Sequence, residues 1–140
     1  MIKLFNPILL LLLMTFSSCF SQVESDKEKT NSFKPKANIE QLEMEVNNGG
    51  FNQYFLNCGQ NCFETLKALK KNNKPKTAKI LESAISLINP KKLSNKILIE
   101  KLRNQEVEEL YNEEISASLN KLDLEFYKYP DGNLTNNSEH

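Results

Sequence analysis

Between positions 39 and 129 the apolar residues form stripes at helical spacing, and this spacing constrains the chain to helical structure. The longest stripe is expected to run from residue 94 to residue 119, with glutamates between its apolar positions. A helix buries such a stripe on one face, whereas a half-buried strand needs strict alternation, and no convincing run of that kind is present. The sequence therefore predicts an all-α fold, a small bundle of about five helices.

Breaker and capping residues divide this region into separate helices. A short helix over residues 39–46 is expected to end at the Asn47-Asn48-Gly49-Gly50 run, and a second short helix follows it, with Phe51, Tyr54 and Phe55 on its buried side. Asn61 followed by Glu64 predicts a capping box for the next helix.

Two proline signals and a final apolar cluster complete the expected order of helices. Pro75 fits the first turn of a helix that ends at Asn89-Pro90. After the long stripe, a short closing helix is expected through Leu122, Phe126 and Tyr127.

The first nineteen residues have the layout of a lipoprotein signal. Lys3 precedes an apolar stretch from residue 8 to residue 16, and Ser17-Ser18-Cys19 follows it. A spanning helix needs about 20 apolar residues, and this stretch is much shorter. The small residues before the cysteine resemble a lipobox, although Phe16 stands where Leu is usual. Residues 1–18 are therefore expected to be a signal peptide and Cys19 the acylated, palmitate-bearing residue that holds the chain at the cell membrane or outer membrane, outside the cytoplasm. The alternative is a plain cleaved signal peptide with an incidental cysteine.

The remaining chain is expected to have three parts. Residues 19–38 are polar and form a lipidated cysteine followed by a flexible tether, since they have little apolar surface to bury. Residues 39–129 form one small domain, and residues 130–140 a disordered polar tail.

Charge is balanced overall but segregated along the chain. Residues 37–66 hold four acidic and no basic residues, residues 67–103 hold eleven basic and two acidic, and residues 104–140 hold nine acidic and two basic. One explanation of this order is that neighbouring helices of opposite charge pack side by side and attract one another. The other is a basic face that meets anionic lipid or a partner. A nucleic-acid-binding protein would carry a clear basic excess, so no nucleic-acid partner is expected.

Few residue types that support catalysis are present. The single histidine is His140, at the end of the chain, so no metal site, cofactor or catalytic residue is expected. Cys58 and Cys62 lie four positions apart, and a structural disulfide between them is geometrically allowed. Simple burial of both thiols is the first alternative, and a thiol redox site is the second.

The segment from residue 42 to residue 57, Leu-Glu-Met-Glu-Val-Asn-Asn-Gly-Gly-Phe-Asn-Gln-Tyr-Phe-Leu-Asn, resembles the signature of the DNA-mimic-protein-19-like family. The resemblance implies an all-helical fold and, for the namesake member, an acidic surface that imitates DNA and occupies the DNA-binding face of a transcription factor. In this chain the middle of the domain is basic, and this departs from the acidic surface that DNA mimicry needs. The signature residues are read as scaffold, with a ligand pocket on Glu45 and Asn47 as the alternative; they are Glu45, Asn47, Asn48, Gly49, Gly50, Phe51, Gln53 and Phe55.

These features together predict a membrane-anchored helical interaction module of the bacterial envelope that is not an enzyme. Its expected partners are the membrane, through the lipid anchor, and a protein, which includes a second copy of the chain. The alternatives are a cytoplasmic DNA-mimic-like regulator that binds a DNA-binding protein, and a thiol redox protein that uses Cys58 and Cys62.

Overall fold

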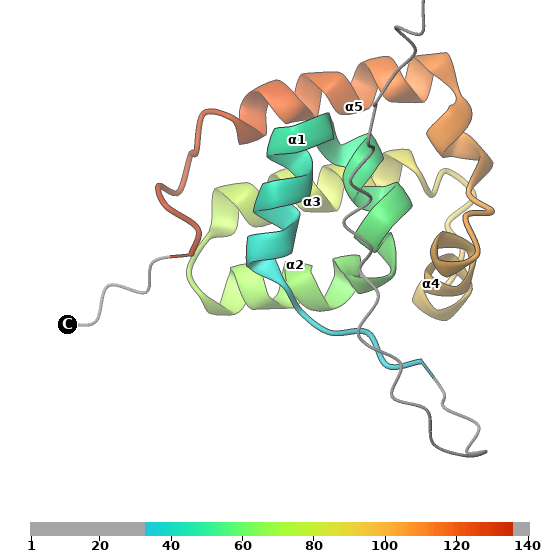
Figure 1. The fold of residues 1–140 in the computed structure, drawn as a ribbon, viewed down its shortest axis with the longest axis horizontal. Coiled ribbons are helices and arrows are strands. Elements are labelled where there is room, and N and C mark those ends of the chain that lie inside the picture. Colours follow the sequence, from blue (N-terminus) through green and yellow to red (C-terminus); the bar gives the residue numbers. More distant parts are fainter. Residues whose placement is uncertain (1–32, 136–140) are drawn as a thin grey trace, which may run out of the picture.

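The computed structural model describes residues 33–135, and within them the chain is all-α, with no strand (Figure 1). The elements follow in the order α1 (Ile39–Cys58), the 3-10 helix η1 (Gly59–Asn61), α2 (Cys62–Lys71), α3 (Pro75–Leu87), α4 (Asn95–Arg103), the 3-10 helix η2 (Glu108–Tyr111) and α5 (Glu113–Phe126). The predicted fold class is therefore confirmed. Cys19 lies outside the described residues, as do the predicted signal peptide and most of the tether.

Helix α1 consists of two helical halves separated by a backbone break. The Asn38 Oδ1 atom accepts a hydrogen bond from the Gln41 N–H at 2.9 Å and caps the first half. Gly49 and Gly50 leave helical geometry, and the second half continues to Cys58. The two short helices expected from the sequence are these two halves.

Helices α2 and α3 form a hairpin, and the cap of α2 differs from the predicted one. The expected capping box at Asn61 is wrong, because that side chain makes no cap bond and its Oδ1 accepts from the Lys36 N–H at 3.0 Å instead. Pro75 begins α3 as predicted. The Asp131 carboxylate, distant in sequence, accepts from the Thr77 N–H at 2.6 Å in the first turn of α3.

The long helix predicted over residues 94–119 is wrong. Helix α4 ends at Arg103, and Gln105 takes a left-handed conformation with φ of 57°. This break turns Val107 and Leu110 into the core as part of a loop and a 3-10 turn. Asn112 then caps α5, because its Oδ1 accepts from the Ile115 N–H at 3.0 Å. The predicted closing helix is the last part of α5.

The helices surround one apolar core. In Figure 1, α5 runs along one edge and α2 along the opposite edge, with α1 and α3 between them and α4 to one side. The largest fully buried side chains are Tyr54, Phe51, Phe55 and Phe126. Leu134 is also buried, and the Lys74 ammonium donates to the carbonyls of Asp131 and Asn133. The packed chain therefore extends past the boundary that the sequence predicts at Tyr129.

Candidate functional site

The Gly49-Gly50 break folds the second half of α1 back beside the first and gives Gly50 an unusual backbone conformation. Gly50 has φ of 76° and ψ of −177°, a region that residues with a Cβ atom rarely adopt. A Cβ atom at Gly50 would lie 2.3 Å from the Asp123 Oδ2 atom. Only glycine fits here, because both the backbone angle and the neighbouring carboxylate exclude a side chain.

Asp123 of α5 contacts this break from the other side of the core. Its Oδ1 atom accepts a hydrogen bond from the Phe51 N–H at 2.8 Å, so it caps the second half of α1 across 72 positions of sequence. The residue is only 7% exposed. Burial raises the pKa of the Asp123 carboxyl, and the Phe51 hydrogen bond opposes that rise.

Glu45 joins the two halves of α1. Its side chain is buried, and its Oε2 atom accepts from the Gln53 amide at 2.9 Å and from the Asn57 amide at 2.8 Å. Its Oε1 atom lies 3.9 Å from the Cys58 Sγ atom. No lysine or arginine of residues 33–135 forms an ion pair with it. Its polar contacts thus go to the second half of the same helix, which supports the scaffold interpretation over a ligand pocket.

Two tyrosines after α5 bind the end of the first half of α1. The Asn47 amide donates to the Tyr129 hydroxyl at 2.7 Å, and the Tyr127 hydroxyl donates to the Val46 carbonyl at 2.9 Å. A carbonyl at the end of a helix lacks a helical partner, and Tyr127 supplies one. Asn48 and Gly49 are exposed to solvent. The aromatic members of the signature lie in the core, where Phe51 stacks edge-on against Phe126 with ring centres 5.7 Å apart.

The Cys58–Cys62 disulfide is absent from the structure, because Cys62 carries a free thiol. Helix α1 ends at Cys58, and the η1 turn directs Cys62 into the core at the start of α2. Burial raises the pKa of the Cys62 thiol to about 12. A thiol with this pKa is almost fully protonated at neutral pH, which disfavours redox chemistry at Cys62.

The Tyr54 hydroxyl lies in the same part of the core. It is fully buried, with Thr65 and Cys62 as neighbours, and makes no hydrogen bond of good geometry. Burial raises the pKa of this phenol further above its usual range. Such an unsatisfied group reduces stability.

A hollow of about 220 Å³ lies between the end of α3, α4 and η2. Its lining combines apolar side chains with charges of both signs, among them Leu98, Val107, Lys101 and Glu109. Neither of the two buried polar atoms without a hydrogen bond in the described residues, the Tyr54 hydroxyl and Thr77 Oγ1, lines it. Residues 33–135 also contain no cluster of histidine, cysteine and acidic side chains that could hold a metal ion. In the same residues, no helix has both the length and the apolar character needed to cross a bilayer.

Several residues that hold the glycine break and the start of α3 were not predicted from the sequence. Asp123, Tyr127 and Asp131 act over more than fifty positions, so no local pattern marks their partners. The Asn52 amide also binds partners far away in the sequence, since it donates to the Leu110 carbonyl at 2.9 Å and to Ser116 at 3.3 Å. These bonds tie the signature to η2 and α5.

The fold and this geometry define a small all-helical domain built around a capped glycine break. The chain belongs to the DMP19-like protein family, whose profile matches residues 34–138. This confirms the resemblance seen in residues 42–57, and the match extends beyond the predicted domain at both ends. No curated protein and no solved structure matches the chain.

Proposed function

We propose that this chain is a non-catalytic helical interaction module of the bacterial envelope, anchored to the membrane through Cys19 and carrying its DMP19-like domain on a tether. The lipobox-like residues before Cys19 support the anchor. The distribution of surface charge in the domain supports the role in binding.

One observation carries the interaction role: within residues 33–135, no salt bridge joins the basic segment to the acidic segment. The ion pairs within residues 33–135 are Lys67–Glu64, Lys70–Glu82 and Lys128–Glu125, and none joins a cation of residues 67–103 to an anion of residues 104–135. The charge of Lys76 nevertheless acts on Asp131 of the acidic segment. Partial burial acts to raise the pKa of Asp131, but the hydrogen bond from Thr77 and the charge of Lys76 outweigh it and lower that pKa. Among the residues that the structure describes, most of these charges therefore form no ion pair, and this supports binding to a charged partner.

The intact mass of the protein extracted from membranes in detergent tests the anchor. The expected mass begins at Cys19 and includes acyl chains, and the Cys19→Ala variant is expected to stay unprocessed and unacylated. A full-length, unlipidated wild-type mass in the soluble fraction would contradict the proposal.

A cytoplasmic DNA-mimic-like regulator is the second candidate, and the acidic side of the domain favours it. Glu106, Glu108, Glu113 and Glu114 are exposed and lie within five positions of Tyr111 in the sequence, which is 67% exposed. This function requires soluble protein and direct binding to a DNA-binding protein.

Cross-linking of the extracted protein identifies the protein partner, and sedimentation in detergent reveals whether that partner is a second copy.

A further inference from the structure

The hollow between the end of α3, α4 and η2 has an apolar floor. Three of the side chains that line it, Ile88, Leu98 and Val107, are each at most 2% exposed. The volume of the hollow is about 220 Å³. Since an apolar cavity of about 150 Å³ is large enough to hold a benzene molecule, this floor can receive one aliphatic or aromatic group of similar size.

Hydrogen bonds fix the two loops that form the walls of the hollow. The Asn89 side chain accepts from the Leu93 N–H at 2.9 Å and donates to the Leu93 carbonyl at 3.0 Å, which closes the loop between α3 and α4. After α4, the left-handed conformation of Gln105 lets the Glu106 N–H donate to the Lys101 carbonyl at 2.8 Å. In Figure 1 both loops lie at the side of the fold where α4 is labelled. The hollow is therefore preformed, as small-molecule sites usually are.

Charges of opposite sign line this hollow from different elements. Lys91, in the loop after α3, and Lys101, on α4, supply two cations. Three carboxylates come from the end of the loop after α4 and from η2, namely Glu106, Glu108 and Glu109. Within residues 33–135, none of these five side chains forms an ion pair.

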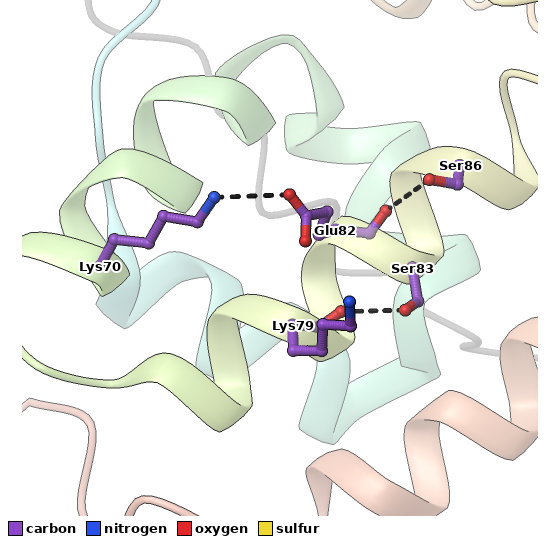
Figure 2. A network of polar contacts seen from close by, with 5 residues as sticks. All are labelled: Lys70, Lys79, Glu82, Ser83 and Ser86. Carbon is purple, nitrogen blue, oxygen red and sulfur yellow. Dashed lines mark hydrogen bonds and ion pairs between the residues drawn. The ribbon is translucent and has the colours of Figure 1, made fainter.

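Opposite charges on neighbouring helices do meet elsewhere in the domain. Figure 2 shows Lys70 of α2 reaching Glu82 of α3, with 3.4 Å between the Nζ and Oε1 atoms. The lysines and glutamates of the hollow share one cavity without such a contact, so a ligand that carries both charges can bind between them. Three carboxylates around one hollow also repel one another, and a cationic group on the ligand relieves that repulsion.

We propose that the hollow binds a small zwitterion with an apolar body, the chemical class of the α-amino acids with aliphatic or aromatic side chains. The side chain of the ligand lies on the apolar floor. Lys91 and Lys101 bind its carboxylate, and the glutamates from the η2 side bind its ammonium group through charge-assisted hydrogen bonds. This inference goes beyond the proposed interaction role and does not depend on the anchor at Cys19.

Equilibrium dialysis of the full chain, extracted in detergent, against radiolabelled L-phenylalanine tests the site. The same detergent is present in both compartments, and the pH is about 6, where α-amino groups are protonated. Three comparison probes each lack one feature: N-acetylphenylalanine lacks the cation, phenylalanine amide lacks the carboxylate, and glycine lacks the apolar body. Phenylalanine is expected to bind saturably at one site, and each comparison probe to bind several-fold more weakly.

Four isosteric variants locate the site on the molecule. Lys101→Gln and Glu109→Gln each neutralise one charge that lines the hollow, and Lys96→Gln and Glu114→Gln neutralise nearby exposed charges that do not line it. Lys101→Gln is expected to reduce the preference for phenylalanine over its amide, and Glu109→Gln the preference over N-acetylphenylalanine. The two controls are expected to keep both preferences. Circular dichroism is expected to show wild-type helix content in all four, because none of these side chains is buried.

Four results would overturn the inference, and each leaves the anchor and the interaction role standing. The first is the absence of saturable phenylalanine binding at millimolar concentration. The second is equal binding of phenylalanine and its amide, which would indicate a site for a cation alone. The third is equal binding of phenylalanine and N-acetylphenylalanine, which would indicate a site for an anion, such as the carboxyl terminus of a partner chain. The fourth is unchanged affinity in both Lys101→Gln and Glu109→Gln, which would place the ligand elsewhere on the molecule.

Discussion

Replacement of Gly50 by alanine is the sharpest test of how this domain is built. The added Cβ atom would lie 2.3 Å from the Asp123 Oδ2 atom and 2.8 Å from its Cγ atom, far closer than a real contact allows. The backbone at this position, with φ of 76° and ψ of −177°, also strains any residue except glycine. Asp123 must therefore move, and its hydrogen bond with the Phe51 N–H is lost.

The size of the effect follows from these two costs. An unfavourable backbone conformation of this kind costs about 1–3 kcal/mol. The loss of a hydrogen bond to a charged group costs about 1.5–3 kcal/mol. Gly50→Ala is therefore expected to lower the free energy of unfolding by roughly 3–5 kcal/mol, a large part of the roughly 5–15 kcal/mol that stabilises a typical domain.

Urea denaturation followed by circular dichroism measures this loss, and Gly132→Ala is the matched control. Gly132 also has a positive φ, of 71°, but a Cβ atom there would meet nothing within 4 Å. The control carries only the backbone cost, about 1–2 kcal/mol. In an Asp123→Ala background, Gly50→Ala is expected to cost less than in the wild type. Equal losses for Gly50→Ala and Gly132→Ala would refute the role assigned to the contact with Asp123.

Three further predictions concern buried and capping groups. Tyr54→Phe removes an unsatisfied hydroxyl and is expected to raise the free energy of unfolding by about 1 kcal/mol, so a less stable variant in urea denaturation would contradict the assignment. Because burial raises the pKa of Cys62 to about 12, iodoacetamide is expected to modify this thiol at neutral pH only when urea unfolds the domain, and rapid labelling of the native protein would contradict that. Asp131→Asn weakens the cap on α3 and is expected to cost about 1 kcal/mol at neutral pH. Since the folded pKa of Asp131 is lowered, its stabilisation is present above the unfolded value of about 4 and is lost as the pH falls through the folded pKa, so a pH-independent difference in thermal denaturation would contradict this cap.

The opposite sign applies to Asp123. Its pKa is raised in the folded protein, so the folded state holds this proton to higher pH than the unfolded chain does. Between the two pKa values, stability from this group falls as the pH rises. The two aspartates therefore act against each other in the acid range, and single variants are needed to separate them.

Local patterns were sufficient for the elements whose geometry depends on neighbouring residues. The apolar stripes predicted helices, Pro75 marked the start of α3, and the two glycines marked the break in α1. The long helix over residues 94–119 failed because the apolar spacing continues through a break. The left-handed turn at Gln105 and the burial of Val107 and Leu110 depend on packing against other helices, which spacing does not report.

The sequence by itself determined the all-helical fold and the place of the glycine break, and it carries the family signature across residues 42–57. These properties follow from the helical period and from residues with special backbone freedom, both of which act within a few positions. Only the tertiary structure decided that Asp123 caps Phe51, that Cys62 is a buried free thiol, and that the segment before α1 packs against the start of α2. Each of these depends on which distant segments meet in the core, because hydrogen bonds and burial act through space and leave no fixed spacing along the chain.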